Sequence, residues 1–172
     1  WNAPGSIGRI AVFHGNFGIY LRAYMYAILH GNYGLRRIAE QAVLNANYLR
    51  VLLGHLLFSP YPQYCMHEFV LQADKYASLG VRALDIAKRL LDYGIHAPTV
   101  YFPLIIKECM LIEPTESESK ATLDNFVSIM QTIIDEIQTD PEIVKKAPHR
   151  MPVQRLDEVR AAKMPILKHQ NT

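Results

Sequence analysis

Two turns in the sequence combine histidine with small polar residues, which are side chains that often contact a substrate or a bound anion. The first turn, His14-Gly15-Asn16, precedes a segment of helical character. Backbone N–H groups converge at a helix start and favour an anion there. The second turn contains His96 and Thr99 and connects two expected elements, a usual place for substrate contacts. Four residues are therefore candidates for binding a substrate or a cofactor: His14, Asn16, His96 and Thr99.

Each candidate also has a purely structural interpretation. Asn16 can cap the helix that follows, with His14 packed on the surface, and we favour capping over binding for this turn. His96 can cover a helix end and Thr99 can open a strand, and here the two interpretations have equal weight. His67-Glu68 has the residue types of an acid–base pair, but neighbours in a strand point to opposite faces. We favour a structural role for this pair, with His67 hydrogen-bonded beneath the domain.

The sequence gives no support for several other kinds of site. Its 7 histidines and 16 acidic residues form no His-x-x-x-His or His-x-x-Glu-His cluster, so we expect no metal site. Cys65 and Cys109 match no metal or redox spacing and fit a reducing compartment. A net charge of +2 is too small to indicate nucleic acid or an anionic membrane as a partner. No apolar run reaches the ~18 residues that span a bilayer, and no secretory signal follows Trp1, a start that indicates a fragment.

A unit of helix, tight turn, strand, connector, strand and helix is expected to position His96. Apolar residues recur at helical spacing from Val81 to Leu91, and Gly94 suits a left-handed helix end. Residues 99–102 and 110–112 form short β-prone runs. These elements predict an α+β substructure with helices packed on a short sheet.

Charge spacing gives finer expectations for the same unit. Asp85 stands four residues before Arg89, and Lys88 stands four before Asp92, so both pairs can lie on the solvent side of the helix. Further along, Thr115-Glu116-Ser117-Glu118 fits a capping box for an amphipathic helix.

The other expected elements lie on both sides of this unit. The segment Ile19–Leu29 has only Arg22 as a charged residue, so we expect a helix that is buried against another surface. In the first part of the chain we also expect a β-prone run at 10–13, a break at Gly31 to Gly34 and a helix over Leu35–Leu56. A strand over Cys65–Leu71 and a loop over Asp74–Gly80 should follow. After the central unit we expect a long helix through Ile137, and then a short helix that Asp140 caps and that reaches Lys146.

The segment from Asp85 to Glu118 resembles a known family. Asp85–Gly94, then His96-Ala97-Pro98-Thr99, then Ile112–Glu118 resemble the C-terminal region of the P-protein of the glycine cleavage system. That protein is the decarboxylating glycine dehydrogenase, which depends on pyridoxal phosphate (PLP). Further similar stretches follow the family order over most of the chain: 6–10, 15–18, 22–24, 42–48, 66–68 and 147–149. Residues 155–159 are more similar to the split form, which is made as two different subunits.

The resemblance implies a fold and a division of the chain. The fold is the small C-terminal α+β domain of a fold-type-I PLP enzyme, with helices on a short, mainly antiparallel sheet. Residues 1–57 would be a lead and long connecting helices that dock on an absent cofactor domain. Residues 58–147 would be the small α+β domain, and residues 148–172 a C-terminal arm with a helical turn.

The resemblance also implies an activity and partners. The family decarboxylates glycine on PLP and passes the aminomethyl group to the lipoyl arm of H-protein. The implied partners are glycine, the cofactor-bearing part of the enzyme, its other subunit and lipoylated H-protein. The implied compartment is the cytoplasm of a bacterium or archaeon, or the mitochondrial matrix of a eukaryote.

The catalytic lysine of the family has no counterpart here. In the family it precedes a glycine-rich stretch, which this sequence lacks, so the resemblance places it upstream. The lysines present lie on expected solvent faces, connectors or the tail: Lys75, Lys88, Lys107, Lys120, Lys145, Lys146, Lys163 and Lys168. We expect no catalytic residue and no bound cofactor in the fragment alone. Two alternatives are the small domain of another PLP-dependent decarboxylase or aminotransferase, and a non-catalytic helical interaction module.

Overall fold

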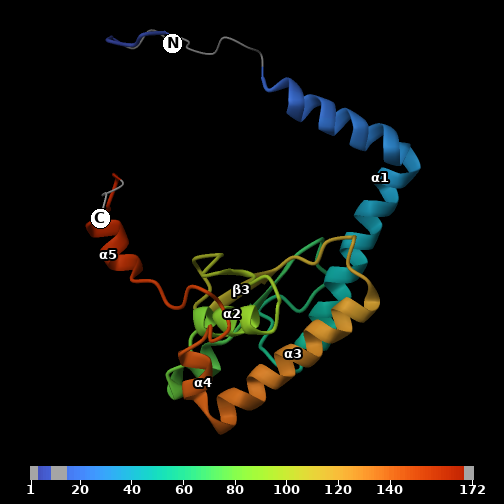
Figure 1. Cartoon of the computed structure of the whole chain (residues 1–172). Helices are drawn as coiled ribbons and strands as arrows, with labels where there is room; N and C mark the ends of the chain where they lie inside the picture. Colours follow the sequence, from blue (N-terminus) through green and yellow to red (C-terminus); the bar gives the residue numbers. More distant parts are fainter. Residues whose placement is uncertain (1–3, 9–14, 169–172) are drawn as a thin grey trace. The chain divides into compact units, whose positions relative to one another are not determined.

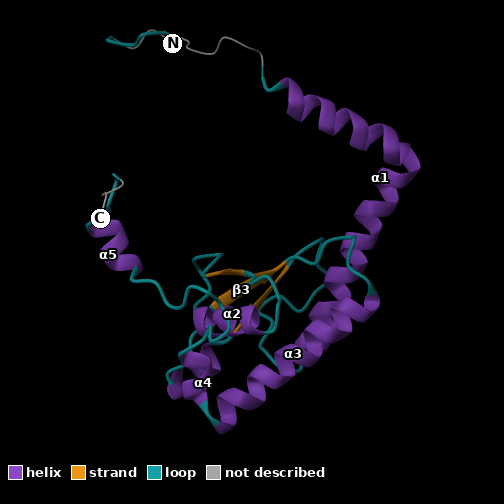
Figure 2. Ribbon diagram, in the orientation of Figure 1, coloured by secondary structure: helices purple, strands orange, loops and turns teal. Residues whose placement is uncertain are grey.

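The computed structural model describes residues 4–8 and 15–168, with the elements drawn in Figures 1 and 2. In chain order these are α1 (Phe17–Leu53), β1 (Phe69–Gln72), the 3-10 helix η1 (Asp74–Leu79), α2 (Ala83–Asp92), β2 (Thr99–Val100), β3 (Cys109–Ile112), α3 (Lys120–Thr139), α4 (Pro141–Lys145) and α5 (Glu158–Lys163). They confirm the expected α+β class. Two predictions, the β-prone run at 10–13 and a role for His14, lie outside the described residues.

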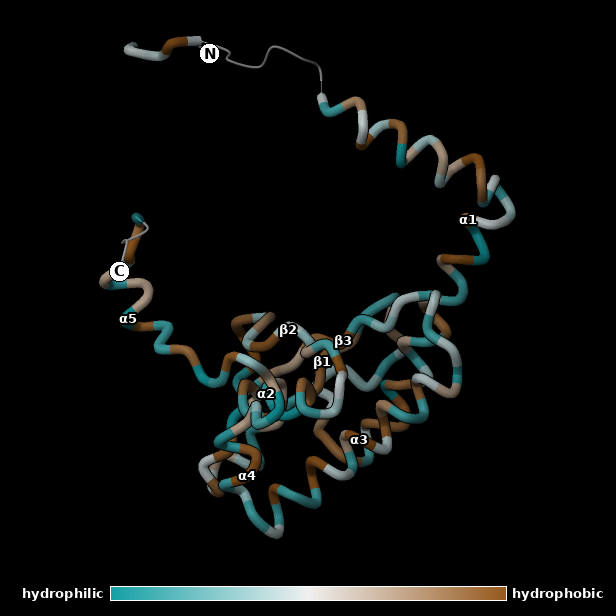
Figure 3. Tube along the Cα trace, in the orientation of Figure 1, coloured by the Kyte–Doolittle hydropathy of each residue, from teal (hydrophilic) through white to brown (hydrophobic). Residues whose placement is uncertain are grey.

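The chain divides into two compact units, and the first contains the residues up to Ala39. Within it Asn16 caps α1, because its Oδ1 accepts the N–H of Gly18 at 3.0 Å. Gly31 has φ 57° and ψ −175°, so helical geometry is interrupted where the sequence predicts a break. Apolar side chains before this point are exposed, including Tyr24 and Leu29. Figure 3 shows hydrophobic positions, in brown, recurring along the first part of α1.

The second unit begins at Glu40 and contains a three-stranded antiparallel sheet in the order β1-β3-β2. Its register pairs Phe69 with Ile112 in the first ladder and Thr99 with Leu111 in the second. Residues 69–71 are all buried, so side chains on both faces of β1 are covered. In Figure 2 the strands lie behind α2 in the middle of this unit.

The predicted strand over Cys65–Leu71 starts later than expected, at Phe69. The backbone of Cys65 is engaged elsewhere, because its N–H donates to Asn47 Oδ1 at 3.1 Å and its carbonyl accepts from Asn47 Nδ2 at 2.7 Å. The expected loop over Asp74–Gly80 is also wrong in part, since Asp74–Leu79 forms η1. Gly80 ends η1 with φ 76°, a left-handed conformation that glycine adopts without strain.

One hydrophobic core joins the later part of α1 to β1, η1, α2, β3, α3 and α4. Apolar burial on this scale is the main driving force for the unit. The largest fully buried side chains are Leu49, Leu53, Leu57, Leu71, Val81, Ile86, Leu90, Met110, Met130, Ile133, Ile137 and Val144. Figure 1 shows α3 running beside the later part of α1, and the Tyr48 hydroxyl donates to Asp124 across this contact.

The start of α3 corrects one prediction. The expected capping box at Thr115–Glu118 is wrong, because Ser119 is the N-cap and its Oγ accepts the N–H of Thr122 at 3.1 Å. Residues 115–118 instead form a turn in which the Glu118 N–H donates to the Thr115 carbonyl at 3.2 Å. The prediction for α4 is confirmed, since Asp140 caps it with Pro141 at the first helical position.

Candidate functional site

A pocket of about 540 Å³ lies within the second unit. It is lined by the turn 94–99, by residues 111–115, by Glu118 and the first turns of α3, and by Leu49 of α1. The structure thus brings His96 and Thr99, two of the sequence candidates, into one recess.

The turn that carries His96 is fixed by the end of α2. Gly94 has φ 74°, its N–H donates to the Leu91 carbonyl at 3.0 Å, and the Ile95 N–H donates to the Leu90 carbonyl at 3.1 Å. This pair of bonds is a Schellman motif, which confirms the predicted left-handed helix end. The chain then enters β2, whose pairing with β3 fixes the backbone at Thr99.

The pocket has an apolar floor and a polar rim. Leu49, Ile112 and Leu123 are buried beneath it, while His96 and Thr99 are exposed at its edge. Glu113 and Glu118 add carboxylates, and no lysine or arginine is among the described residues that line the pocket. Such a recess can hold a partly apolar group by hydrogen bonds and can exchange a proton through the imidazole. None of its described lining residues offers a primary amine for a Schiff base or a permanent cation for a phosphate.

The other candidates are not among the described residues that line this recess, and His14 lies outside the described residues. Asn16 belongs to the first unit, and its side-chain oxygen caps α1, the interpretation that the sequence favours. His67 corrects a prediction: its side chain is 55% exposed, with Nε2 4.0 Å from Glu113 Oε1, so it is not hydrogen-bonded beneath the domain. Its exposure follows from its place before β1 begins.

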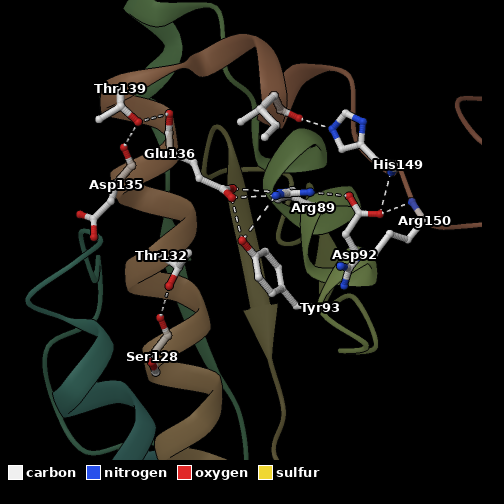
Figure 4. A network of polar contacts seen from close by, with 11 residues as sticks. Arg89, Asp92, Tyr93, Ser128, Thr132, Asp135, Glu136, Thr139, His149 and Arg150 are labelled. Carbon is white, nitrogen blue, oxygen red and sulfur yellow. Dashed lines mark hydrogen bonds and ion pairs between the residues drawn. The ribbon is translucent and has the colours of Figure 1, made fainter.

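A polar cluster joins α2 to α3 and is drawn in Figure 4. Arg89 donates from Nε and Nη2 to the two Glu136 carboxylate oxygens at 2.9 and 2.7 Å. Its Nη1 donates to Asp92 Oδ2 at 2.9 Å. The Tyr93 hydroxyl donates to Glu136 Oε1 at 2.7 Å, so the carboxylate is held from two sides.

Asp92 extends the cluster to the segment after α4. Its Oδ1 accepts the backbone N–H groups of His149 and Arg150 at 2.6 and 2.7 Å, while the His149 ring pairs with the Ile143 carbonyl at 2.6 Å. Burial alone would raise the pKa of Asp92, but the Arg150 amide, Arg89 and the His149 amide lower it overall. Arg89 likewise lowers the pKa of Glu136.

These contacts overturn the predicted charge pairs on α2. Arg89 pairs with Asp92 and Glu136 rather than with Asp85, and the Asp92 side chain is 2% exposed rather than on the solvent face. Asp85 instead accepts from Arg155 Nη2 at 2.7 Å. The cluster fixes chain segments to one another and leaves no open group for a ligand, so we assign it a structural role.

Sequence reasoning missed a residue that holds the pocket wall, Asn45. Asn45, on α1, is 3% exposed and donates to the carbonyl oxygens of Thr115 and Glu118. The only signal for this was its place in the stretch 42–48 that resembles the known family. Among the described residues, no group of histidine, cysteine and acidic side chains could hold a metal ion. No described helix is both long and apolar enough to cross a membrane.

Comparison with known proteins addresses the same region. A family model described as glycine dehydrogenase, C-terminal domain, matches residues 38–150, a range that includes the pocket and the polar cluster around Arg89. The chain belongs to this family. It is 55% identical to a probable glycine dehydrogenase (decarboxylating) subunit 2 of Oceanobacillus iheyensis, over 98% of this chain and 35% of that protein.

Other relatives carry the same name. The protein of Fervidobacterium nodosum is 52% identical over 98% of this chain and 36% of its own length. That of Staphylococcus saprophyticus is 56% identical over 96% of this chain and 34% of its own length. The chain thus spans about a third of the length of these curated relatives, and the family expected from the sequence is confirmed.

Proposed function

We propose that this chain is the C-terminal part of a decarboxylating glycine dehydrogenase that is built from two kinds of polypeptide. The observation that carries the proposal is identity of 52–56% over at least 96% of the chain to proteins named as subunit 2 of that enzyme. The complete enzyme would decarboxylate glycine on PLP and pass the aminomethyl group to the lipoyl arm of H-protein. Because those relatives are bacterial, a bacterial cytoplasm is the compartment that fits best.

The described pocket does not fit PLP as a covalently held cofactor. No lysine is among its described lining residues, and Glu113 and Glu118 would oppose a phosphate group. The described lysines are all at least partly exposed, and none of them lines the pocket. We therefore place the cofactor and its lysine in the part of the enzyme outside this chain.

In this proposal the chain contributes one wall of the site and the contacts that hold it there. His96 and Thr99 would offer an imidazole and a hydroxyl to the substrate or cofactor, and the apolar floor would exclude water. His14 and Asn16 remain candidates for contacts of the same kind, although capping of α1 is the interpretation that the sequence favours for Asn16.

The predicted division of the chain gives a docking role to the part of α1 that precedes Gly31. Its exposed apolar residues would dock on the cofactor-bearing part, because apolar surface of this extent marks an interaction site. A self-sufficient helical interaction module would instead cover its apolar helix faces. Residues 58–147 would form the small domain beside the cofactor, and residues 148–172 an arm.

The test is to assemble the chain, within its full-length subunit and with the other subunit and PLP, and to measure carbon dioxide release from carboxyl-labelled glycine. We expect release that depends on lipoylated H-protein. The chain alone, treated with PLP and borohydride, should show no stoichiometric cofactor adduct in its intact mass. A single adduct at one lysine would overturn the division of labour, and an inactive assembly would overturn the proposed activity.

A paired substitution tests the pocket itself. His96→Gln should lower kcat/KM for glycine by about tenfold or more, the effect of losing one polar contact to a charged group. His55→Gln is the matched control, because His55 is exposed and does not line the pocket. Equal activities for the two variants would exclude His96 from the site.

A further inference from the structure

Asn45 connects α1 to the turn that forms one wall of the pocket. Its Nδ2 donates to the carbonyl oxygen of Thr115 at 2.9 Å and to that of Glu118 at 3.3 Å. Its Oδ1 accepts from Gln41 Nε2 at 2.7 Å. Both the nitrogen and the oxygen of the side-chain amide are therefore hydrogen-bonded, in a residue that is only 3% exposed.

The chemistry of these partners fixes the orientation of the amide. Carbonyl oxygens only accept hydrogen bonds, so the nitrogen of Asn45 must face Thr115 and Glu118. Gln41 supplies the donor that the remaining oxygen needs. An aspartate of the same shape would set an acceptor against two carbonyl oxygens, and an apolar residue would leave both carbonyls without this donor.

The turn that Asn45 holds does not cap α3, although its sequence predicts a capping box. Because Ser119 caps α3, the side chains of Thr115 and Glu118 are not consumed at the helix start, and both residues line the pocket. The Thr115 carbonyl accepts from the Glu118 N–H as well as from Asn45, so one oxygen closes the turn and anchors it.

We infer that Asn45 is a positioning residue for the pocket. It holds the Thr115–Glu118 turn in place relative to the turn that carries His96 and Thr99. The inference rests on the proposed function, since it concerns the same recess. A shift of about 1 Å in one wall of a site can lower a rate as much as losing a direct contact.

Asn47 provides a matched control on the same helix. Its Nδ2 donates to the Cys65 carbonyl at 2.7 Å and to the Val43 carbonyl at 2.9 Å, so it too pins a loop through its amide nitrogen. Cys65 does not line the pocket. Asn45→Asp and Asn47→Asp therefore remove the same kind of donor, and only the first removes it from the pocket wall.

The experiment compares both variants in the complete enzyme, by steady-state kinetics and by hydrogen exchange read on peptides. For Asn45→Asp we expect faster exchange at residues 115–118 and a KM for glycine raised about tenfold. Asn47→Asp should lose a comparable amount of thermal stability while its KM and kcat stay those of the unaltered enzyme.

Two results would overturn the inference. Unchanged exchange at residues 115–118 would mean that Asn45 does not hold the turn. Faster exchange with kinetics equal to those of Asn47→Asp would mean that the turn is held but does not position the site. If the unaltered enzyme releases no carbon dioxide from glycine, the proposed function itself is wrong. This result is obtained before any variant is compared, so the two failures are distinguishable.

Discussion

Arg89 is the residue on which three parts of the second unit converge. Its guanidinium spans Glu136 of α3 and Asp92 of α2, and Asp92 in turn holds the backbone of residues 149–150. The exposed fractions of these side chains are 12% for Arg89, 18% for Glu136 and 2% for Asp92. A buried ion pair adds little net stability over an apolar pair, but removing one partner leaves the other charge uncompensated.

Asp92→Asn is the sharpest test of this cluster. The substituted amide could still accept from the His149 and Arg150 N–H groups, but its NH2 would then face the Arg89 guanidinium, donor against donor. We expect the free energy of unfolding to fall by about 3 kcal/mol, measured by urea denaturation of the chain.

The control for that substitution is an exposed ion pair. Glu142 contacts Lys145 and Lys146 from a side chain that is 52% exposed, and such pairs contribute little in water. Glu142→Gln should therefore leave the urea midpoint nearly unchanged. If Asp92→Asn is as mild as Glu142→Gln, the cluster does not hold the unit together.

At the scale of the element, α3 starts where its side-chain chemistry permits rather than where the capping box in the sequence predicts. Ser119 Oγ satisfies the Thr122 N–H, so Ser119→Ala should lower the free energy of unfolding by about 1 kcal/mol. Thr115→Ala should change it by no more than the ~0.5 kcal/mol typical of a surface site. Far-ultraviolet circular dichroism during denaturation measures both, and the reverse order would restore the capping box.

The end of α2 depends on one backbone conformation. Gly94 has φ 74°, and a Cβ built there meets nothing within 4 Å, so a substitution meets backbone strain but no steric clash. Gly94→Ala should cost about 1 kcal/mol, and Gly94→Asn less, because asparagine tolerates the left-handed region better than alanine. Thermal denaturation of the two variants measures the difference. Equal losses would point to something other than this conformation.

Local signals explain which elements the sequence predicts well. The end of α2 at Gly94, the cap of α4 at Asp140 and the break at Gly31 depend on neighbours within a few residues, and all three appear where expected. The charge pairs on α2 were predicted wrongly because spacing of four residues ignores α3. Glu136 stands 47 residues from Arg89, and no local pattern in the sequence predicts that the two residues pair.

The same limit applies to the candidate site. His96 and Thr99 could be selected because a turn between elements is a local pattern. The role of Asn45 in holding the pocket wall could not be predicted in this way. Asn45 stands 70 residues before Thr115, and its role depends on how α1 packs. The local pattern also does not distinguish the two possible caps of α3, Thr115 and Ser119, and Ser119 is the one that the structure uses.

For the molecule as a whole, the two carboxylates paired with Arg89 predict how stability depends on pH. Asp92 and Glu136 have pKa values below their ordinary 3.8 and 4.5, so folding favours their charged forms. Their contribution is complete above about pH 4.5, the unfolded value for Glu136, and is lost as pH falls through the folded values. Below that pH the unfolded chain binds more protons than the folded one, so stability rises with pH.

Removing one of these carboxylates should flatten that dependence. We expect the free energy of unfolding of the unaltered chain, measured by urea denaturation from pH 3 to 6, to fall steeply below about pH 4.5. Glu136→Gln should be less stable at pH 6 and should show a smaller slope below pH 4.5, because one proton fewer is taken up on unfolding. Glu116→Gln removes an equal charge from outside the Arg89 cluster and should keep the steep slope. The two variants each lack one carboxylate, and only Glu136→Gln lacks one of the Arg89 cluster. Equal slopes for the two variants would mean that acid unfolds the chain through other groups, and that the charge of Glu136 does not contribute to the pH dependence of stability.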